Sequence, residues 1–188
     1  MSKEMWDELE GDLVEDLATA IREKNGMVMI HNCGERIYFD AQIKRMQPEA
    51  ISFLYPPDDC KDFKECKEKY GDVTTLIGCV TPASAVIGAD EEWDQECRDS
   101  IDAMAKGGGF VLAAGCEYPA NASFDRAQRM VEIAKTGSVK NFVALVKNSS
   151  FLVRITDMTI LIEKEFIYGS SKRPNSTDYY RKQHYQCG

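Results

Sequence analysis

The stretch Met27-Val-Met-Ile-His-Asn-Cys-Gly34 decides how the rest of the chain is interpreted. It predicts a short apolar strand over Met27–Ile30 that leads into His31 and Cys33 and is broken by Gly34. Successive side chains of a strand point to opposite faces, so His31 and Cys33 share one face. An imidazole and a thiol placed in this way at the end of a buried strand are usable zinc ligands.

A third soft ligand stands at the end of another apolar stretch, Gly109-Phe-Val-Leu-Ala-Ala-Gly-Cys116. If both stretches are strands of one sheet, His31, Cys33 and Cys116 converge on one zinc ion. The competing interpretation is a core histidine with two buried free thiols. The third ligand at an equivalent strand end favours the zinc site over that interpretation.

Strands and helices alternate along residues 2–135. Apolar residues spaced by three or four predict a helix over residues 2–24, at Trp6, Leu9, Leu13, Leu17 and Ile21. Further strands are predicted at Ala50–Leu54, Thr74–Cys79 and Phe110–Ala114, and further helices at residues 39–46, 60–69, 90–106 and 123–135. One helix followed by four strand–helix units indicates an α/β fold with a parallel sheet, whose short strands are apolar because both faces are covered.

Ligands of such folds gather at the carboxyl ends of the strands. Tyr55 and Asp58 follow the second strand and Glu117 follows Cys116, so these three are further candidates for a cofactor-binding role. Tyr55 and Asp58 have structural alternatives, because strand-end aromatics usually serve packing and acidic residues after Pro-Pro usually form a loop or helix cap. Glu117 would point away from the metal if the strand geometry continued through it.

Charge and composition exclude several classes of protein. The net charge of -8 argues against nucleic-acid binding, which needs clustered Lys and Arg. No apolar run approaches the roughly 20 residues that span a bilayer, and the N-terminus lacks the apolar core of a signal peptide. We therefore expect a cytoplasmic protein without nucleic-acid or membrane partners. In such a protein, clustered cysteines among the seven suggest metal binding or catalysis before disulfides.

The last part of the chain differs from the rest. Beyond residue 137 the alternation with helices stops, and strands are predicted at Phe142–Val146, Phe151–Ile155 and Thr159–Ile167. Residues 136–188 hold eight Lys and Arg against four Asp and Glu, so this part is basic although the whole chain is acidic. We expect residues 138–188 to form a separate appendage, as a β-rich extension or a partly disordered tail.

Four segments resemble the uroporphyrinogen decarboxylase superfamily: His31-Asn-Cys-Gly34, Tyr55-Pro-Pro-Asp-Asp59, Gly78-Cys-Val-Thr-Pro82 and Gly107-Gly-Gly-Phe-Val-Leu-Ala-Ala-Gly-Cys-Glu-Tyr-Pro119. Within it, the chain is most similar to zinc-dependent corrinoid methyltransferases of the methylcobamide:coenzyme M type, which carry a His-x-Cys pair and one distant Cys. The decarboxylases typically carry a His where this chain has Cys116. That difference favours the methyltransferase branch.

The resemblance covers residues 1–137 and implies a partial TIM-type (βα)8 barrel, namely its C-terminal half. A complete barrel of this kind needs about 250 residues or more, whereas this part of the chain has about four parallel strand–helix units. The family's N-terminal half helps to form the substrate cleft and has no counterpart in this sequence. A half barrel leaves two sheet edges and an apolar inner face open. We therefore expect as partner the missing barrel half, a corrinoid protein or a second copy in a homo-oligomer.

The resemblance also implies an activity, a zinc-dependent methyl transfer from a methyl-corrinoid on a partner protein to a thiol or similar acceptor. His31, Cys33 and Cys116 would hold the zinc, and the open fourth position would convert the acceptor thiol into a nucleophile. Two alternatives stay open. One is a uroporphyrinogen decarboxylase-like tetrapyrrole enzyme of porphyrin biosynthesis, and the other is a non-catalytic truncated remnant.

Overall fold

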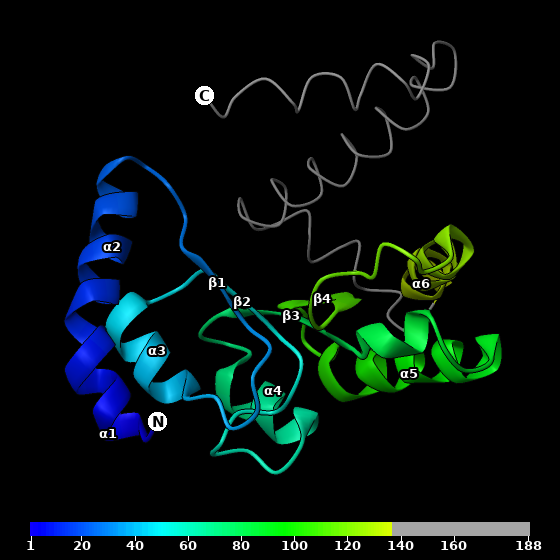
Figure 1. The fold of residues 1–188 in the computed structure, drawn as a ribbon, viewed down its shortest axis with the longest axis horizontal. Helices are drawn as coiled ribbons and strands as arrows, with labels where there is room; N and C mark the ends of the chain where they lie inside the picture. Colours follow the sequence, from blue (N-terminus) through cyan, green and yellow to red (C-terminus); the bar gives the residue numbers. More distant parts are fainter. Residues whose placement is uncertain (137–188) are drawn as a thin grey trace, which may run out of the picture. The chain divides into compact units, whose positions relative to one another are not determined.

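The computed structural model describes residues 1–136 of the 188-residue chain. Four strands form one parallel sheet in the order β1-β2-β3-β4, with β1 at Met29–Asn32, β2 at Ala50–Phe53, β3 at Thr75–Val80 and β4 at Phe110–Ala114 (Figure 1). The sheet is not closed, because β1 and β4 have no second partner strand among the described residues. This is the partial TIM-type α/β fold that the sequence predicts. The expected appendage, residues 138–188, lies outside the described residues.

Helices precede, connect and follow the strands. The first helical segment consists of α1 (Lys3–Trp6), a π-helical turn η1 (Asp7–Gly11) and α2 (Asp12–Glu23). The later helices are α3 (Phe39–Met46), α4 (Phe63–Tyr70), a 3-10 turn η2 (Pro82–Ala85), α5 (Asp90–Met104) and α6 (Phe124–Thr136). Within residues 1–136, no helix has the length and apolar character needed to cross a membrane.

The first strand begins two residues later than the sequence predicts, at Met29 instead of Met27. The backbone amide of Val28 donates to the carboxylate of Glu49 at 2.6 Å, and the ladder with β2 starts only after it. The pairing of β1 with β2 also continues to Asn32, whereas the predicted strand ends at Ile30. His31 therefore lies inside the strand, in the sheet, and not in the loop that follows it.

One face of the sheet packs against the helices and holds the main core. Ile51 and Phe53 of β2, Leu76 of β3 and Phe110 of β4 point to this face and are at most 2% exposed. The ring of Phe39 in α3 lies edge-on to Phe53, with ring centroids 5.1 Å apart. This burial fixes the register of the strands, because a slip of one residue would turn the apolar side chains to the opposite face.

The opposite face of the sheet carries the side chains that alternate with this core. The β1–β2 register places Met29 opposite Ala50 and His31 opposite Ser52. Because successive strand residues alternate between faces, these four side chains share the face away from Ile51. The candidate histidine thus stands on the face that would line the inside of a barrel.

The first helical segment buries only some of the apolar residues that its periodicity singles out. Trp6 and Ala18 are 8% and 2% exposed and pack against α3 in a second core cluster. Leu9, Leu13 and Leu17 are instead 61%, 70% and 61% exposed. A π-helical turn forms i→i+5 hydrogen bonds and takes one extra residue, so η1 rotates the residues after it relative to Trp6.

Ion pairs hold this segment on α3. The guanidinium of Arg45 contacts the carboxylates of Asp7 at 2.6 Å, Glu15 at 2.8 Å and Asp12 at 2.9 Å. A single exposed ion pair contributes little to stability, but one guanidinium shared by three carboxylates fixes how the segment lies on α3. The side of the segment that faces away from α3 carries the exposed leucines.

Candidate metal centre

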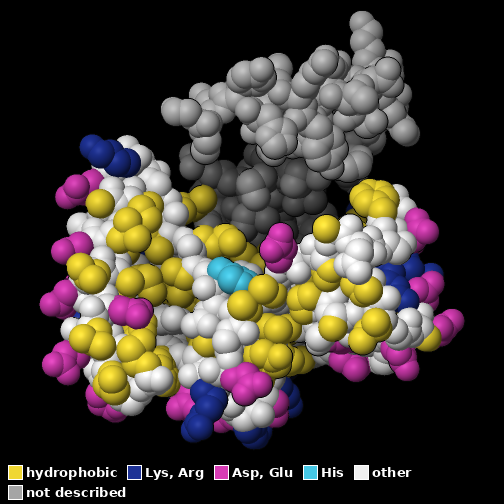
Figure 2. Space-filling model, in the orientation of Figure 1, with side chains coloured by type: hydrophobic (Ala, Val, Ile, Leu, Met, Phe, Trp, Pro, Cys, Tyr) yellow, Lys and Arg dark blue, Asp and Glu magenta, His cyan; other side chains and the backbone are white. Residues whose placement is uncertain are grey.

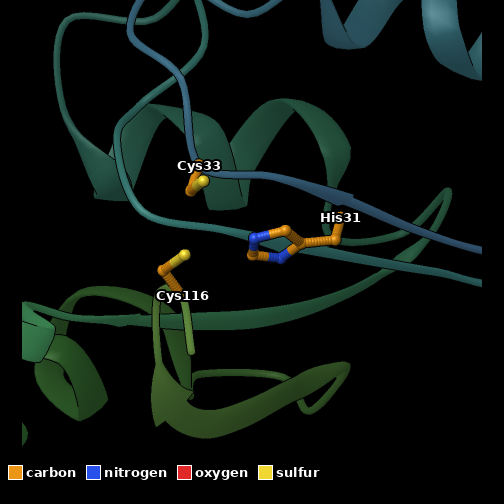
Figure 3. Close-up of side chains that lie close together, drawn as sticks. All are labelled: His31, Cys33 and Cys116. Carbon is orange, nitrogen blue, oxygen red and sulfur yellow. The ribbon is translucent and has the colours of Figure 1, made fainter. Parts of the chain in front are cut away.

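His31, Cys33 and Cys116 meet at the carboxyl ends of the outer strands β1 and β4. Their ligand atoms all lie within 4.8 Å of one another, and Figure 3 shows the imidazole and both sulfurs turned toward one shared space. On a flat sheet, strands three places apart would be about 14 Å from each other. The sheet therefore curls toward the face of His31, and the curl brings residues from both edges into one site.

Two glycines let the strand ends approach one another beside Cys116. A Cβ at Gly78 would collide with the carbonyl oxygen of Phe53, and the φ of Gly78 is +139°, a conformation that favours glycine. A Cβ at Gly115 would lie 2.6 Å from a methyl carbon of Leu54. A larger residue at either position would push the strands apart, so the glycines keep Cys116 close to the end of β2.

Ser52 orients the imidazole of His31. The two residues are opposite each other in the β1–β2 pair, and the Ser52 hydroxyl lies 3.1 Å from Nδ1 of His31. When Nδ1–H donates to this hydroxyl, Nε2 carries the free lone pair that a metal requires. Sequence analysis does not identify Ser52, because a serine in an apolar strand belongs to no motif. Ser52 is recognised only from the register of the β1–β2 pair, which places it opposite His31.

The two thiols of the centre interact with each other. A hydrogen bond with Cys116 is the main cause that raises the pKa of Cys33, and burial adds to the effect. Without a metal, Cys33 is therefore protonated at neutral pH. Metal ligands must be thiolates, so binding a cation here releases protons and strengthens as the pH rises.

The donor atoms fit zinc. Zinc binds sulfur at about 2.3 Å and nitrogen at about 2.0–2.1 Å, so tetrahedral ligand atoms lie about 3.5–3.8 Å apart. Starting from spacings within 4.8 Å, the ligand atoms would approach one another by about 1.3 Å at most to reach that geometry. Two sulfurs and a nitrogen suit zinc better than magnesium or calcium, which prefer oxygen. Three protein ligands also leave a fourth position open, as in catalytic zinc sites.

The structure does not bring Tyr55, Asp58 or Glu117 into this group of ligands. Tyr55 is 41% exposed and borders a separate hollow of about 490 Å³ between α4 and α5. Asp58 accepts a hydrogen bond from Nε of Arg36 at 3.1 Å, and Glu117 is exposed. A cofactor-binding role for these three residues stays a prediction.

The other four described cysteines are buried or half-buried thiols. Cys66, Cys79 and Cys97 are buried, and Cys60 is half-buried. Burial raises the pKa of Cys60 to about 11 and the pKa values of Cys79 and Cys97 to about 12, so these thiols stay protonated. None of the four belongs to the group of candidate ligands. Cys187 lies outside the described residues.

A curled parallel sheet with a ligand group at the carboxyl ends of its strands defines a barrel-type α/β protein with a candidate metal site. The family model described as uroporphyrinogen decarboxylase (URO-D) matches residues 1–137. The chain belongs to this family, as its sequence motifs suggest. Comparison with curated proteins finds no match.

Proposed function

We propose that the chain is a zinc-dependent methyltransferase domain that moves a methyl group from a methyl-corrinoid to a thiol acceptor. The observation that supports this proposal is the convergence of His31, Cys33 and Cys116, whose ligand atoms lie within 4.8 Å of one another. Zinc bound there would keep the acceptor thiol in its thiolate form at neutral pH. Membership of the uroporphyrinogen decarboxylase family is compatible with this activity.

The residues of the chain would bind and orient in this reaction. The two cysteines would lose their protons on metal binding, and a hydrogen bond from Nδ1–H to Ser52 would leave Nε2 of His31 as the ligand atom. Zinc held there would supply the acceptor as a thiolate. The acceptor sulfur would then form a bond to the methyl carbon as the cobalt–carbon bond breaks, and the electron pair of that bond would stay with the corrinoid donor, so the products would be a thioether and the demethylated corrinoid.

Metal content is the first test. The purified full chain should carry about one zinc ion per molecule, measured by elemental analysis. Cys116→Ser should lose most of this zinc, whereas Cys60→Ser changes a thiol outside the ligand group and should keep it. Full retention of zinc by Cys116→Ser would remove that residue from the site.

Methyl transfer is tested separately with methylcobalamin and a thiol. Zinc-dependent loss of the methylcobalamin absorption, together with thioether formation, supports the transferase, and Cys33→Ser should abolish both. Zinc binding without turnover, with methylcobalamin and with a methylated corrinoid protein, would contradict the transferase and leave a metal-binding remnant. Incubation of the same preparation with uroporphyrinogen tests the decarboxylase alternative.

A further inference from the structure

The β1 side of the described fold is apolar and open. Among the described strands, β1 is one edge of the sheet, and an unpaired strand edge invites pairing with another chain. Leu9, Leu13 and Leu17 in the first helical segment are 61%, 70% and 61% exposed, and Met29 of β1 is 62% exposed. Residues four apart share one face of a helix, so these leucines form a leucine stripe. Figure 2 shows hydrophobic side chains exposed over α2.

The β4 side is the second edge of the sheet, and α6 lies next to it. One side of α6 is fastened to α5, where Arg129 contacts the carboxylate of Asp94 at 2.8 Å. Val131 of α6 is 47% exposed and lies outside this contact. Figure 1 shows α2 and α6 at opposite ends of the row of strands. The row of helices thus ends with the exposed leucines of the first helical segment on one side and with α6, which exposes Val131, on the other.

The number of elements defines what would close the barrel. A (βα)8 barrel has eight strands and eight helices. Residues 1–136 supply four strands and five helices of at least eight residues, counting the first segment as one helix. The fifth helix is the one that precedes β1. What residues 1–136 leave open in such a barrel is four strands and three helices, a unit that begins and ends with a strand.

We infer that the leucine stripe and the free edge of β1 form the docking surface for a unit of four parallel strands and three helices. The last strand of this unit pairs with β1, and its last helix covers the leucine stripe. Its first strand pairs with β4 beneath α6. The closed barrel surrounds the face that carries His31. This inference rests on the open sheet and the exposed leucines and is independent of methyl transfer.

A second copy of this chain fits the surface less well. Two copies of residues 1–136 would bring ten long helices to eight strands, so α6 of one copy and α2 of the other would compete for one place at each junction. Lys3–Glu23 also holds eight carboxylates against two basic side chains. Arg45 pairs with three of these carboxylates, and two such segments still repel each other. The helix that covers the leucine stripe should therefore carry basic residues beside its apolar face.

The test uses the full chain and a separate polypeptide with the first four strands and three intervening helices of a complete family barrel. Light scattering after size exclusion should show a 1:1 complex. The double variant Leu13→Gln/Leu17→Gln should weaken this complex at least tenfold. Val73→Gln is the matched control, because Val73 is 61% exposed and lies between α4 and β3, away from the leucine stripe. Zinc content of the chain alone should not differ between the two variants.

Three results would overturn the inference. The first is no complex, or a complex that the double variant does not weaken. The second is a dimer of the chain alone that the double variant dissolves, which would make a second copy the occupant. The third is a lower melting temperature of the monomeric double variant, which would mean that the chain itself already covers the leucines. Because zinc binding is measured separately, failure here is distinct from failure of the proposed function.

Discussion

The hydroxyl of Ser52 lies beside the imidazole of His31, across the β1–β2 pair. It lies 3.1 Å from Nδ1, which leaves Nε2 for a metal. Metal-bound imidazoles generally donate their second N–H to a neighbouring group, which fixes the ring and its tautomer. Ser52 belongs to β2 and is 9% exposed, so its position depends on strand register and not on a loop. It is a positioning residue, because it acts on a metal only through His31.

Replacing Ser52 should therefore weaken zinc binding. Ser52→Ala is expected to lower the zinc affinity by about 10- to 100-fold, measured by competition with a fluorescent chelator. Ser52→Thr keeps a hydroxyl and should restore most of the affinity. Ser100→Ala removes a buried hydroxyl from α5 and should have no effect on it. Equal losses in Ser52→Ala and Ser100→Ala would show a general destabilisation instead.

The three candidate ligands can be predicted from the sequence, because both their type and their place at strand ends point to a metal. Ser52 cannot be predicted, because its partner depends on register, and a four-residue strand has several registers until the core selects one. The sequence places Tyr55 at a strand end but does not indicate which space it borders, which in the structure is the hollow between α4 and α5.

At the scale of elements, the order of helices and strands follows from periodicity, but the exposed face of the first helical segment does not. Periodicity groups Trp6 with the leucines, whereas the structure buries Trp6 and Ala18 and exposes Leu9, Leu13 and Leu17. The π-helical turn Asp7–Gly11 contains Leu9 and precedes Leu13 and Leu17, so it changes the angular relation of these residues to Trp6, and no residue type marks that turn in the sequence. The most buried residue of α2 is Ala18, and an alanine contributes little to an apolar pattern in the sequence.

Substitutions in this segment should have effects opposite to those that the pattern predicts. Ala18→Leu should destabilise the chain by about 1–3 kcal/mol, because the added atoms overpack a site that is 2% exposed. Leu13→Ala should change the unfolding free energy by no more than about 0.5 kcal/mol, because that side chain is exposed. Urea denaturation followed by circular dichroism measures both. If Leu13→Ala lowered the unfolding free energy more than Ala18→Leu, the buried and exposed faces of the segment would be assigned the wrong way round.

At the scale of the whole molecule, the candidate metal centre brings the two edges of the sheet together. His31 belongs to β1, and Cys116 follows β4, so a bound ion would fasten the first strand to the last. The strands between them are already held by the ladder and the core. Metal binding should therefore stabilise the curl of the sheet more than any single strand.

Zinc should accordingly raise the stability of the full chain. At a free zinc concentration 100 times the dissociation constant, the unfolding free energy should increase by about 2.7 kcal/mol. Thermal unfolding with and without a chelator measures the change. At one fixed zinc concentration, the increase should be larger at pH 8 than at pH 6, because Cys33 has a raised pKa and must lose its proton to bind, so the dissociation constant falls as the pH rises. Cys116→Ser should remove the zinc effect, and an unchanged increase in that variant would contradict the shared site.

The ligands of the centre are also far apart in the order of synthesis. The 82 residues 34–115 separate Cys33 from Cys116. At about 5–20 residues per second, a ribosome adds this segment in about 4–16 s. During that time the nascent chain presents a histidine and one thiol but not the second thiol, and bringing the ends together early costs loop entropy. Metal capture is therefore expected to follow the pairing of β4, as a late step in the maturation of the chain.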